Sequence, residues 1–128
     1  MPGQKSIHDL NEKELDLYFK TLTAVANIDG EFDKKEKAFI EDQAALIRFD
    51  VKEYLDHPEQ NMAFLVDREI SDTCGKVILR DCLLLCYADG IFNEFERRAM
   101  MNVSRLLGVD DQDFTEIDEW RAGILERL

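Results

Sequence analysis

Acidic side chains recur in two short stretches of the sequence, ANIDGEFDKKE at residues 26–36 and CYADGIFNEFE at residues 86–96. The acids that we single out are Asp29, Asp33 and Glu36 in the first stretch, and Asp89 and Glu96 in the second. Such carboxylates could hold a hard cation, because calcium and magnesium prefer oxygen ligands. They could also act as a general acid and base. The spacing matches the second half of a calcium-binding EF-hand loop, with aspartate, glycine and glutamate at its positions 5, 6 and 12.

The first half of an EF-hand loop is missing from both stretches. Its positions 1 and 3 would be Val25 and Asn27 in the first copy, and Leu85 and Tyr87 in the second. Valine and leucine have no side-chain ligand atoms, and both continue the apolar period of the preceding segment. The sequence therefore excludes an EF-hand. It predicts instead that a helix runs straight into each Asp-Gly pair, which we call a DG corner.

Apolar residues recur at spacings of three and four along most of the chain, which is typical of helices. We predict seven helices, at about residues 12–28, 34–47, 50–57, 59–68, 72–88 and 94–107, and from 110 onward. Asn11, Asp50, Ser71 and Asp110 precede four of them and are suitable N-caps. No segment shows strand alternation, so the expected fold class is all-α, and the widest apolar faces predict that the helices near 12–28 and 72–88 are the most buried.

The sequence also contains an internal repeat. Asp29-Gly30 and Asp89-Gly90 are sixty residues apart, and the same offset pairs N-caps, helix ends and core positions. Residues 11–54 and 71–114 therefore form two copies of a three-helix unit, joined by residues 55–70. We expect one domain over residues 1–128.

Helix capping explains most of each DG corner. Gly30 and Gly90 suit the left-handed residue that ends a helix. Asp33 and Asn93 can cap the next helix, and Glu36 and Glu96 hold the capping-box position three residues later. None of these roles needs a ligand.

Asp29 and Asp89 remain to be explained. Each lies at the carboxyl end of a predicted helix, where an anion costs roughly 0.3–1 kcal/mol against the helix dipole. An Asx-turn to nearby backbone N–H groups could compensate, and so could a bound divalent cation, calcium or magnesium. Both explanations are open at this point.

Composition narrows the classes of partner. Twenty-eight acids face sixteen bases, for a net charge of −12, and this field repels nucleic acids and anionic membranes. No apolar run suggests a signal peptide or a membrane span, so we expect a cytoplasmic protein. No zinc spacing, phosphate loop or nucleophile motif is present, so we expect no enzyme activity. Cys74, Cys82 and Cys86 are expected to be buried thiols, and Asp81, on an apolar helix face, needs a buried partner.

The chain resembles a known family through two motifs. They are Ile28-Asp29-Gly30-Glu31-Phe32-Asp33 with Glu36, and Ala88-Asp89-Gly90-Ile91-Phe92-Asn93 with Glu96. A doubled motif of this kind, in an all-helical chain of this length, resembles the TerB-like family, named after a tellurite-resistance protein. The resemblance implies a compact seven-helix bundle with pseudo-twofold symmetry, in a bacterial cytoplasmic protein of the stress response. It implies metal chelation by Asp29, Glu36, Asp89 and Glu96, with Ile91 and Asn93 making the second corner less acidic.

These observations lead to two functional interpretations. The first is a non-enzymatic, stress-response protein that binds divalent cations at its DG corners and is associated with tellurite resistance. The second is a protein-interaction adaptor whose acids are structural caps without metal. In either case we expect a protein partner, and the chain itself to be a monomer or a homodimer.

Overall fold

The computed structural model describes residues 7–27, 34–57, 71–86 and 94–126, and these residues form helices and connecting turns with no strand among them. The elements are η1 (Ile7–Asp9), α1 (Glu12–Ala26), α2 (Lys34–Leu46), α3 (Lys52–Asp56), α4 (Asp72–Cys86), α5 (Glu94–Leu106) and α6 (Asp111–Glu126). The all-α prediction is confirmed. The helix expected at residues 59–68 lies outside the described residues.

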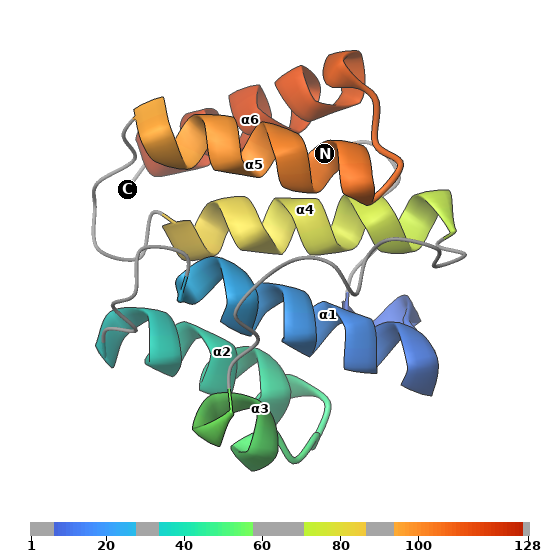
Figure 1. Cartoon of the computed structure of the whole chain (residues 1–128), viewed down its shortest axis with the longest axis vertical. Helices are drawn as coiled ribbons and strands as arrows, with labels where there is room; N and C mark the ends of the chain where they lie inside the picture. Colours follow the sequence, from blue (N-terminus) through green and yellow to red (C-terminus); the bar gives the residue numbers. More distant parts are fainter. Residues whose placement is uncertain (1–6, 28–33, 58–70, 87–93, 127–128) are drawn as a thin grey trace.

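Helices α1 and α4 lie next to each other in the middle of the molecule (Figure 1). Helices α2 and α3 pack on the α1 side, and α5 and α6 pack on the α4 side. Helix α4 contacts α1, α2, α5 and α6, so it is the central element of this arrangement. Its position agrees with its sequence, because a helix that is apolar on nearly every side must be covered on nearly every side.

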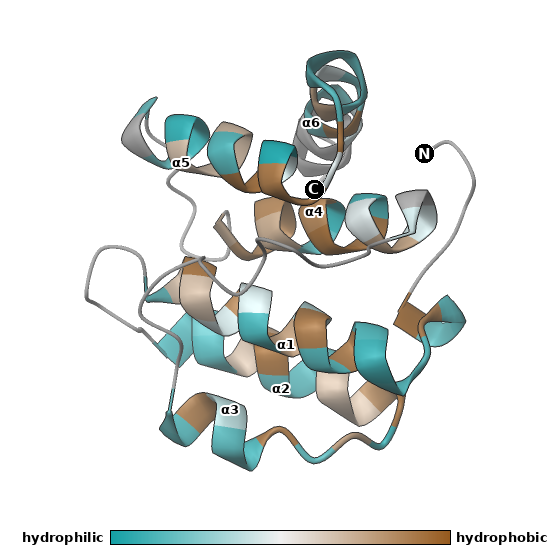
Figure 2. Cartoon of the chain, turned by 45° about the vertical axis from the view of Figure 1, so that its right-hand side comes forward, coloured by the Kyte–Doolittle hydropathy of each residue, from teal (hydrophilic) through white to brown (hydrophobic). Residues whose placement is uncertain are grey.

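The hydrophobic core follows the two central helices. In Figure 2, hydrophobic residues run along α1 and α4 where the two helices face each other. The buried apolar side chains of α4 are Cys74, Val77, Ile78, Leu79, Cys82, Leu83, Leu85 and Cys86. Helix α1 buries an almost continuous run from Leu17 to Ala26, whereas α2 buries only Ile40 and Ala44. The prediction that the two long helices are the most buried is therefore confirmed.

Side-chain caps begin several helices. Asn11 caps α1 in a capping box, because its Oδ1 accepts from the Glu14 N–H (2.9 Å) and Glu14 Oε1 accepts from the Asn11 N–H (3.1 Å). Ser71 Oγ accepts from the Cys74 N–H before α4, and Asp110 Oδ1 accepts from the Asp113 N–H before α6. These three predicted caps are confirmed.

The start of α3 differs from the prediction. The residue at the N-cap position is Val51, and no side chain caps the helix there. Asp50, the predicted cap, lies one residue earlier and accepts a hydrogen bond from the Lys52 N–H (3.1 Å). This bond reaches the residue two positions ahead, whereas the three confirmed caps each bond to the residue three positions ahead. Asp50 therefore closes the turn that precedes α3.

The sixty-residue offset holds for the two leading helices of each repeat. Helices α1 and α4 begin at residues 12 and 72 and end at 26 and 86, and α2 and α5 begin at 34 and 94 and end at 46 and 106. The turn that follows is also repeated. The Phe49 N–H donates to the Ala44 carbonyl and the Val109 N–H donates to the Ser104 carbonyl, both at 2.9 Å.

The repeated turn has a left-handed residue in both copies. It is Gly108, with φ 77°, in the second copy and Arg48, with φ 55°, in the first. Glycine takes this conformation freely, whereas a side chain crowds the following carbonyl. The first copy therefore carries backbone strain that the second copy avoids.

We predict that Arg48→Gly stabilises the protein by about 0.5–1 kcal/mol, because it relieves the strain at the left-handed residue. Gly108→Ala is the matched test in the other repeat and should destabilise by about 1 kcal/mol. A β-carbon at Gly108 would meet no atom within 4 Å, so this loss would come from the backbone conformation and not from a steric clash. Urea unfolding of the two variants and the wild type measures both effects, and equal signs for the two would contradict the repeat of the turn.

Candidate functional site

The structure covers only part of the predicted metal site. Glu36 and Glu96 lie in the first turns of α2 and α5, both half-buried and at equivalent places in the two repeats. Asp29, Asp33 and Asp89 lie outside the described residues, as do Gly30 and Gly90. Within the part of the chain that is described, no three His, Cys, Asp or Glu side chains form a group that could hold a metal ion.

Helices α1 and α4, which lead into the two DG corners, share an electrostatic feature. Neither helix has a basic residue in its last turn. Helices α2, α3 and α6 also lack one, whereas α5 has Arg105 in its last turn. A cation near a helix C-terminus is favourable because the carbonyl end of the helix dipole is negative. The described residues of α1 and α4 leave this negative end without a basic side chain of its own helix.

The carboxylate of Asp81 has the buried partner that the sequence predicted. Only 3% of Asp81 is exposed, and its Oδ2 accepts a hydrogen bond of 2.7 Å from the Tyr18 hydroxyl on α1. Its neighbour Arg80 adds an ion pair, with Nε 2.9 Å from Oδ1. The Tyr18 hydroxyl also lies 3.5 Å from Gln43 Oε1 of α2. Asp81 is therefore a structural charge that joins α1 to α4.

The three cysteines are buried, as predicted. Burial, with the Glu14 carboxylate nearby, raises the pKa of Cys74 from 9.0 to about 12. Burial also raises the pKa of Cys82, well above 9.0, and the neighbouring Cys86 thiol adds to this effect. Because the thiolate is the reactive form of cysteine, these residues behave as small apolar side chains.

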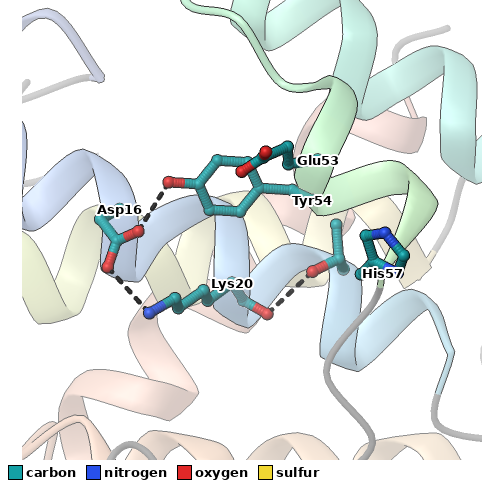
Figure 3. Close-up of a pocket in the computed structure, with 6 residues that line it drawn as sticks. Asp16, Lys20, Glu53, Tyr54 and His57 are labelled. Atoms are coloured by element: carbon teal, nitrogen blue, oxygen red, sulfur yellow. Dashed lines mark hydrogen bonds and ion pairs between the residues drawn. The ribbon is translucent and has the colours of Figure 1, made fainter.

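A polar pocket of about 340 Å3 opens between α1 and α3 (Figure 3). Its lining residues are Asp16, Lys20, Thr23, Glu53, Tyr54 and His57. We call it the α1–α3 pocket. Asp16, Lys20 and Thr23 project from successive turns of α1, because they are spaced by four and three residues. Glu53 and Tyr54 belong to α3, and His57 follows its last residue.

Two bonds to Asp16 organise this pocket. The Tyr54 hydroxyl donates to Asp16 Oδ1 (2.6 Å), and the Lys20 ammonium lies 3.1 Å from Asp16 Oδ2. Burial and the hydrogen bond to Asp16 both raise the pKa of Tyr54 well above its ordinary 10.0. Tyr54 therefore stays protonated at neutral pH and acts as a hydrogen-bond donor. The Thr23 hydroxyl donates to the Phe19 carbonyl of its own helix (2.9 Å).

Sequence reasoning missed the α1–α3 pocket. His57 and Tyr54 belong to no recognisable motif, so the sequence does not single them out. A comparison of the two repeats could have indicated this pocket. At the sixty-residue offset, Thr23, Tyr54 and His57 correspond to Leu83, Phe114 and Ile117, so polarity changes at three positions that face one another.

We predict that Tyr18→Phe lowers the unfolding free energy by about 1–3 kcal/mol, because it removes a hydrogen bond to the buried Asp81 carboxylate. Tyr54→Phe is the matched control, since the same hydroxyl is lost from a bond to the more exposed Asp16. Its cost should be about 1 kcal/mol or less. Denaturant unfolding of both variants checks this, and a larger loss at Tyr54 would show that Asp81 does not depend on Tyr18.

We also predict that stability falls as the pH rises above about 9. The unfolded thiols ionise near their ordinary pKa of 9.0, whereas Cys74, with a pKa of about 12, and Cys82 stay protonated in the folded state. The folded protein therefore holds more protons in this range, and each thiol contributes a loss of up to about 1.4 kcal/mol per pH unit.

Urea unfolding at several pH values between about 8 and 10.5 measures this slope. The double variant Cys74→Ala and Cys82→Ala is less stable at every pH because it leaves cavities. Its slope, however, should be shallower than that of the wild type. Equal slopes in the two proteins would contradict the prediction.

Comparisons with known proteins assign no family to this arrangement. No family model, no curated protein and no solved structure matches the chain at a significant level. Every helix in the described residues is too short or too polar to cross a membrane.

Proposed function

We propose that this protein is a non-enzymatic, TerB-like binding protein that takes up a divalent cation, calcium or magnesium, at its DG corners. The ligands would be Asp29, Asp33 and Glu36 at the first corner and Asp89 and Glu96 at the second. Following the same resemblance, it would act in the bacterial cytoplasm, in a stress response associated with tellurite resistance.

One observation carries the proposal. The helices on either side of the two corners begin and end sixty residues apart, at 12 and 72, 26 and 86, 34 and 94, and 46 and 106. The two Asp-Gly pairs therefore connect equivalent helices in both repeats. A corner of this kind combines carboxylates with the backbone carbonyls of a helix end, and both are oxygen ligands suited to calcium or magnesium.

Electrostatics supports the same proposal. The last turns of α1 and α4 contain no basic residue, and aspartate follows each of them within the corner. The net charge of −12 attracts cations to the protein as a whole. A divalent ion would offset the repulsion between the aspartate and the negative helix end. The first corner should bind more tightly, since Asp33 is replaced by Asn93 in the second.

A second function, a protein-interaction adaptor, is favoured by a different observation. Leu46 is 58% exposed and Leu106 is 38% exposed, and these two large apolar residues occupy the same place at the ends of α2 and α5. A groove of about 390 Å3 between α2 and α3 includes Phe49, Val51 and Leu55. In this alternative the acids of the corners cap helices and hold no ion.

Melting curves of the wild type and of Asp29→Asn separate the two functions. Without divalent ions the variant should be unchanged or slightly more stable, because an anion has left the negative end of a helix. With saturating calcium or magnesium the wild type should gain stability, about 2.7 kcal/mol when the ion is at a hundred times its Kd. Asp29→Asn should lose most of that gain, and Asp89→Asn a smaller part.

The matched control is Asp42→Asn, which removes one negative charge from the exposed surface of α2 without touching a corner. All samples are compared at equal ionic strength, so that screening by salt is the same in each. If Asp29→Asn and Asp42→Asn respond to divalent ions in the same way, no ion is bound at the first corner and the adaptor function is the better explanation.

A further inference from the structure

The α1–α3 pocket has a counterpart in the other repeat. Adding sixty to its six positions gives Lys76, Arg80, Leu83, Asp113, Phe114 and Ile117. Three of these counterparts belong to the hydrophobic core and are no more than 3% exposed: Leu83, Phe114 and Ile117. The repeat therefore offers an internal comparison, in which the same backbone arrangement is filled with apolar side chains.

This comparison separates what the fold requires from what the pocket contains. The second repeat forms its helix pair with leucine, phenylalanine and isoleucine at these places, so threonine, tyrosine and histidine are not needed to form the first. The third helices also differ, because α3 ends at Asp56 whereas the equivalent α6 runs on to Glu126. The first repeat therefore has a pocket lined by polar groups at the place where the second repeat has buried apolar side chains.

Several polar groups of the pocket are available to a ligand. Within the described residues, neither the Glu53 carboxylate nor the His57 imidazole takes part in a hydrogen bond or ion pair, and both residues are exposed. The Lys20 ammonium has three donors and one ion pair, to Asp16. The recess therefore offers a negative group on α3 and a positive group on α1.

We propose that the α1–α3 pocket binds a small zwitterion that carries an ammonium and a carboxylate, such as a free α-amino acid. The ligand's ammonium pairs with Glu53, and its carboxylate pairs with Lys20 and accepts from His57. The Tyr54 ring, fixed by its bond to Asp16 and packed against Phe19 (6.0 Å between centroids), gives the ligand's carbon atoms an apolar surface.

Charge and size select this class of ligand. A simple anion is repelled by Glu53, by Asp16 and by the net charge of −12, while a simple cation can pair with Glu53 but makes no use of the Lys20 ammonium or the His57 imidazole. A zwitterion satisfies both signs without adding net charge. The volume of about 340 Å3 lies at the lower end of the range for small-molecule sites, about 300–1,000 Å3, which suits a molecule the size of an amino acid.

The test is a titration of the isotope-labelled protein followed by NMR, with leucine as the probe and isoamylamine and 4-methylpentanoate as matched single-charge compounds. At about 10 mM, above the roughly millimolar Kd expected for a small ligand in an open pocket, leucine should shift the amides of residues 16–23 and 53–57 saturably. The two single-charge compounds should bind about tenfold more weakly, because each lacks one charge-assisted hydrogen bond.

Two variants change the charges without disturbing the core. Glu53→Gln and Lys20→Gln should each weaken leucine binding about tenfold, since both side chains lie at the rim and each loses one ionic contact. Asp113→Asn is the matched control, because it removes the charge that corresponds to Glu53 from the other repeat. It should leave leucine binding unchanged.

A third variant copies the second repeat into the first, with Thr23→Leu, Tyr54→Phe and His57→Ile. This variant should fold, because the same three apolar residues are accommodated in the second repeat. Leucine should produce no saturable shifts in it. The proposal is overturned if leucine produces no saturable shifts in the wild type, if isoamylamine or 4-methylpentanoate binds as tightly as leucine, or if Glu53→Gln binds as the wild type does. Asp29→Asn should bind leucine normally, so this result is independent of the DG corners.

Discussion

A carboxylate placed among apolar side chains between α1 and α4 constrains much of the molecule. Asp81 is almost fully buried, and a buried charge is tolerated only when it is paired and hydrogen-bonded. Tyr18 and Arg80 supply those bonds, and the bond from Tyr18 joins α1 to α4. Helices α2 and α3 pack against α1, α5 and α6 pack against α4, and α2 also contacts α4, so the outer helices all rest on the helix pair that this bond joins.

Most of the fold could be predicted from the sequence because its signals agree with one another. Apolar periodicity and the caps Asn11 and Ser71 repeat at an offset of sixty, and the helices follow them, but α1 and α4 end at Ala26 and Cys86, two residues before the predicted ends. The glycine stops lie outside the described residues. The need of Asp81 for a partner could be predicted from its apolar face, but its partner could not, since Tyr18 lies 63 residues away and local patterns do not specify which helices pack together. The left-handed Arg48 could not be predicted from its residue type, because arginine is uncommon at positive φ. The left-handed conformation accompanies the bond from the Phe49 N–H to the Ala44 carbonyl, which closes the same turn as the equivalent bond beside Gly108.

The candidate site could be predicted less well than the fold. The acids of the DG corners were found by their spacing, which local sequence displays directly, and Glu36 and Glu96 do occupy the first turns of their helices. The α1–α3 pocket was missed because its residues come from two segments and match no motif. Whether Tyr54 is a core aromatic or a pocket donor depends on Asp16, a residue 38 positions away. Only a comparison of the two repeats, position by position, carries that information in the sequence.

The shared interface between α1 and α4 also bears on how the chain folds. The helix that buries the apolar face of α1 belongs to the other repeat, so either repeat alone would leave a wide hydrophobic surface in water. Tyr18 and Asp81, 63 positions apart, can meet only after the segment between them has closed into a loop, and closing such a loop costs entropy before any contact compensates. Folding rates of small proteins fall as contacts become less local. This helical chain should therefore fold more slowly than an up-and-down bundle of the same length, in one cooperative step that involves both repeats.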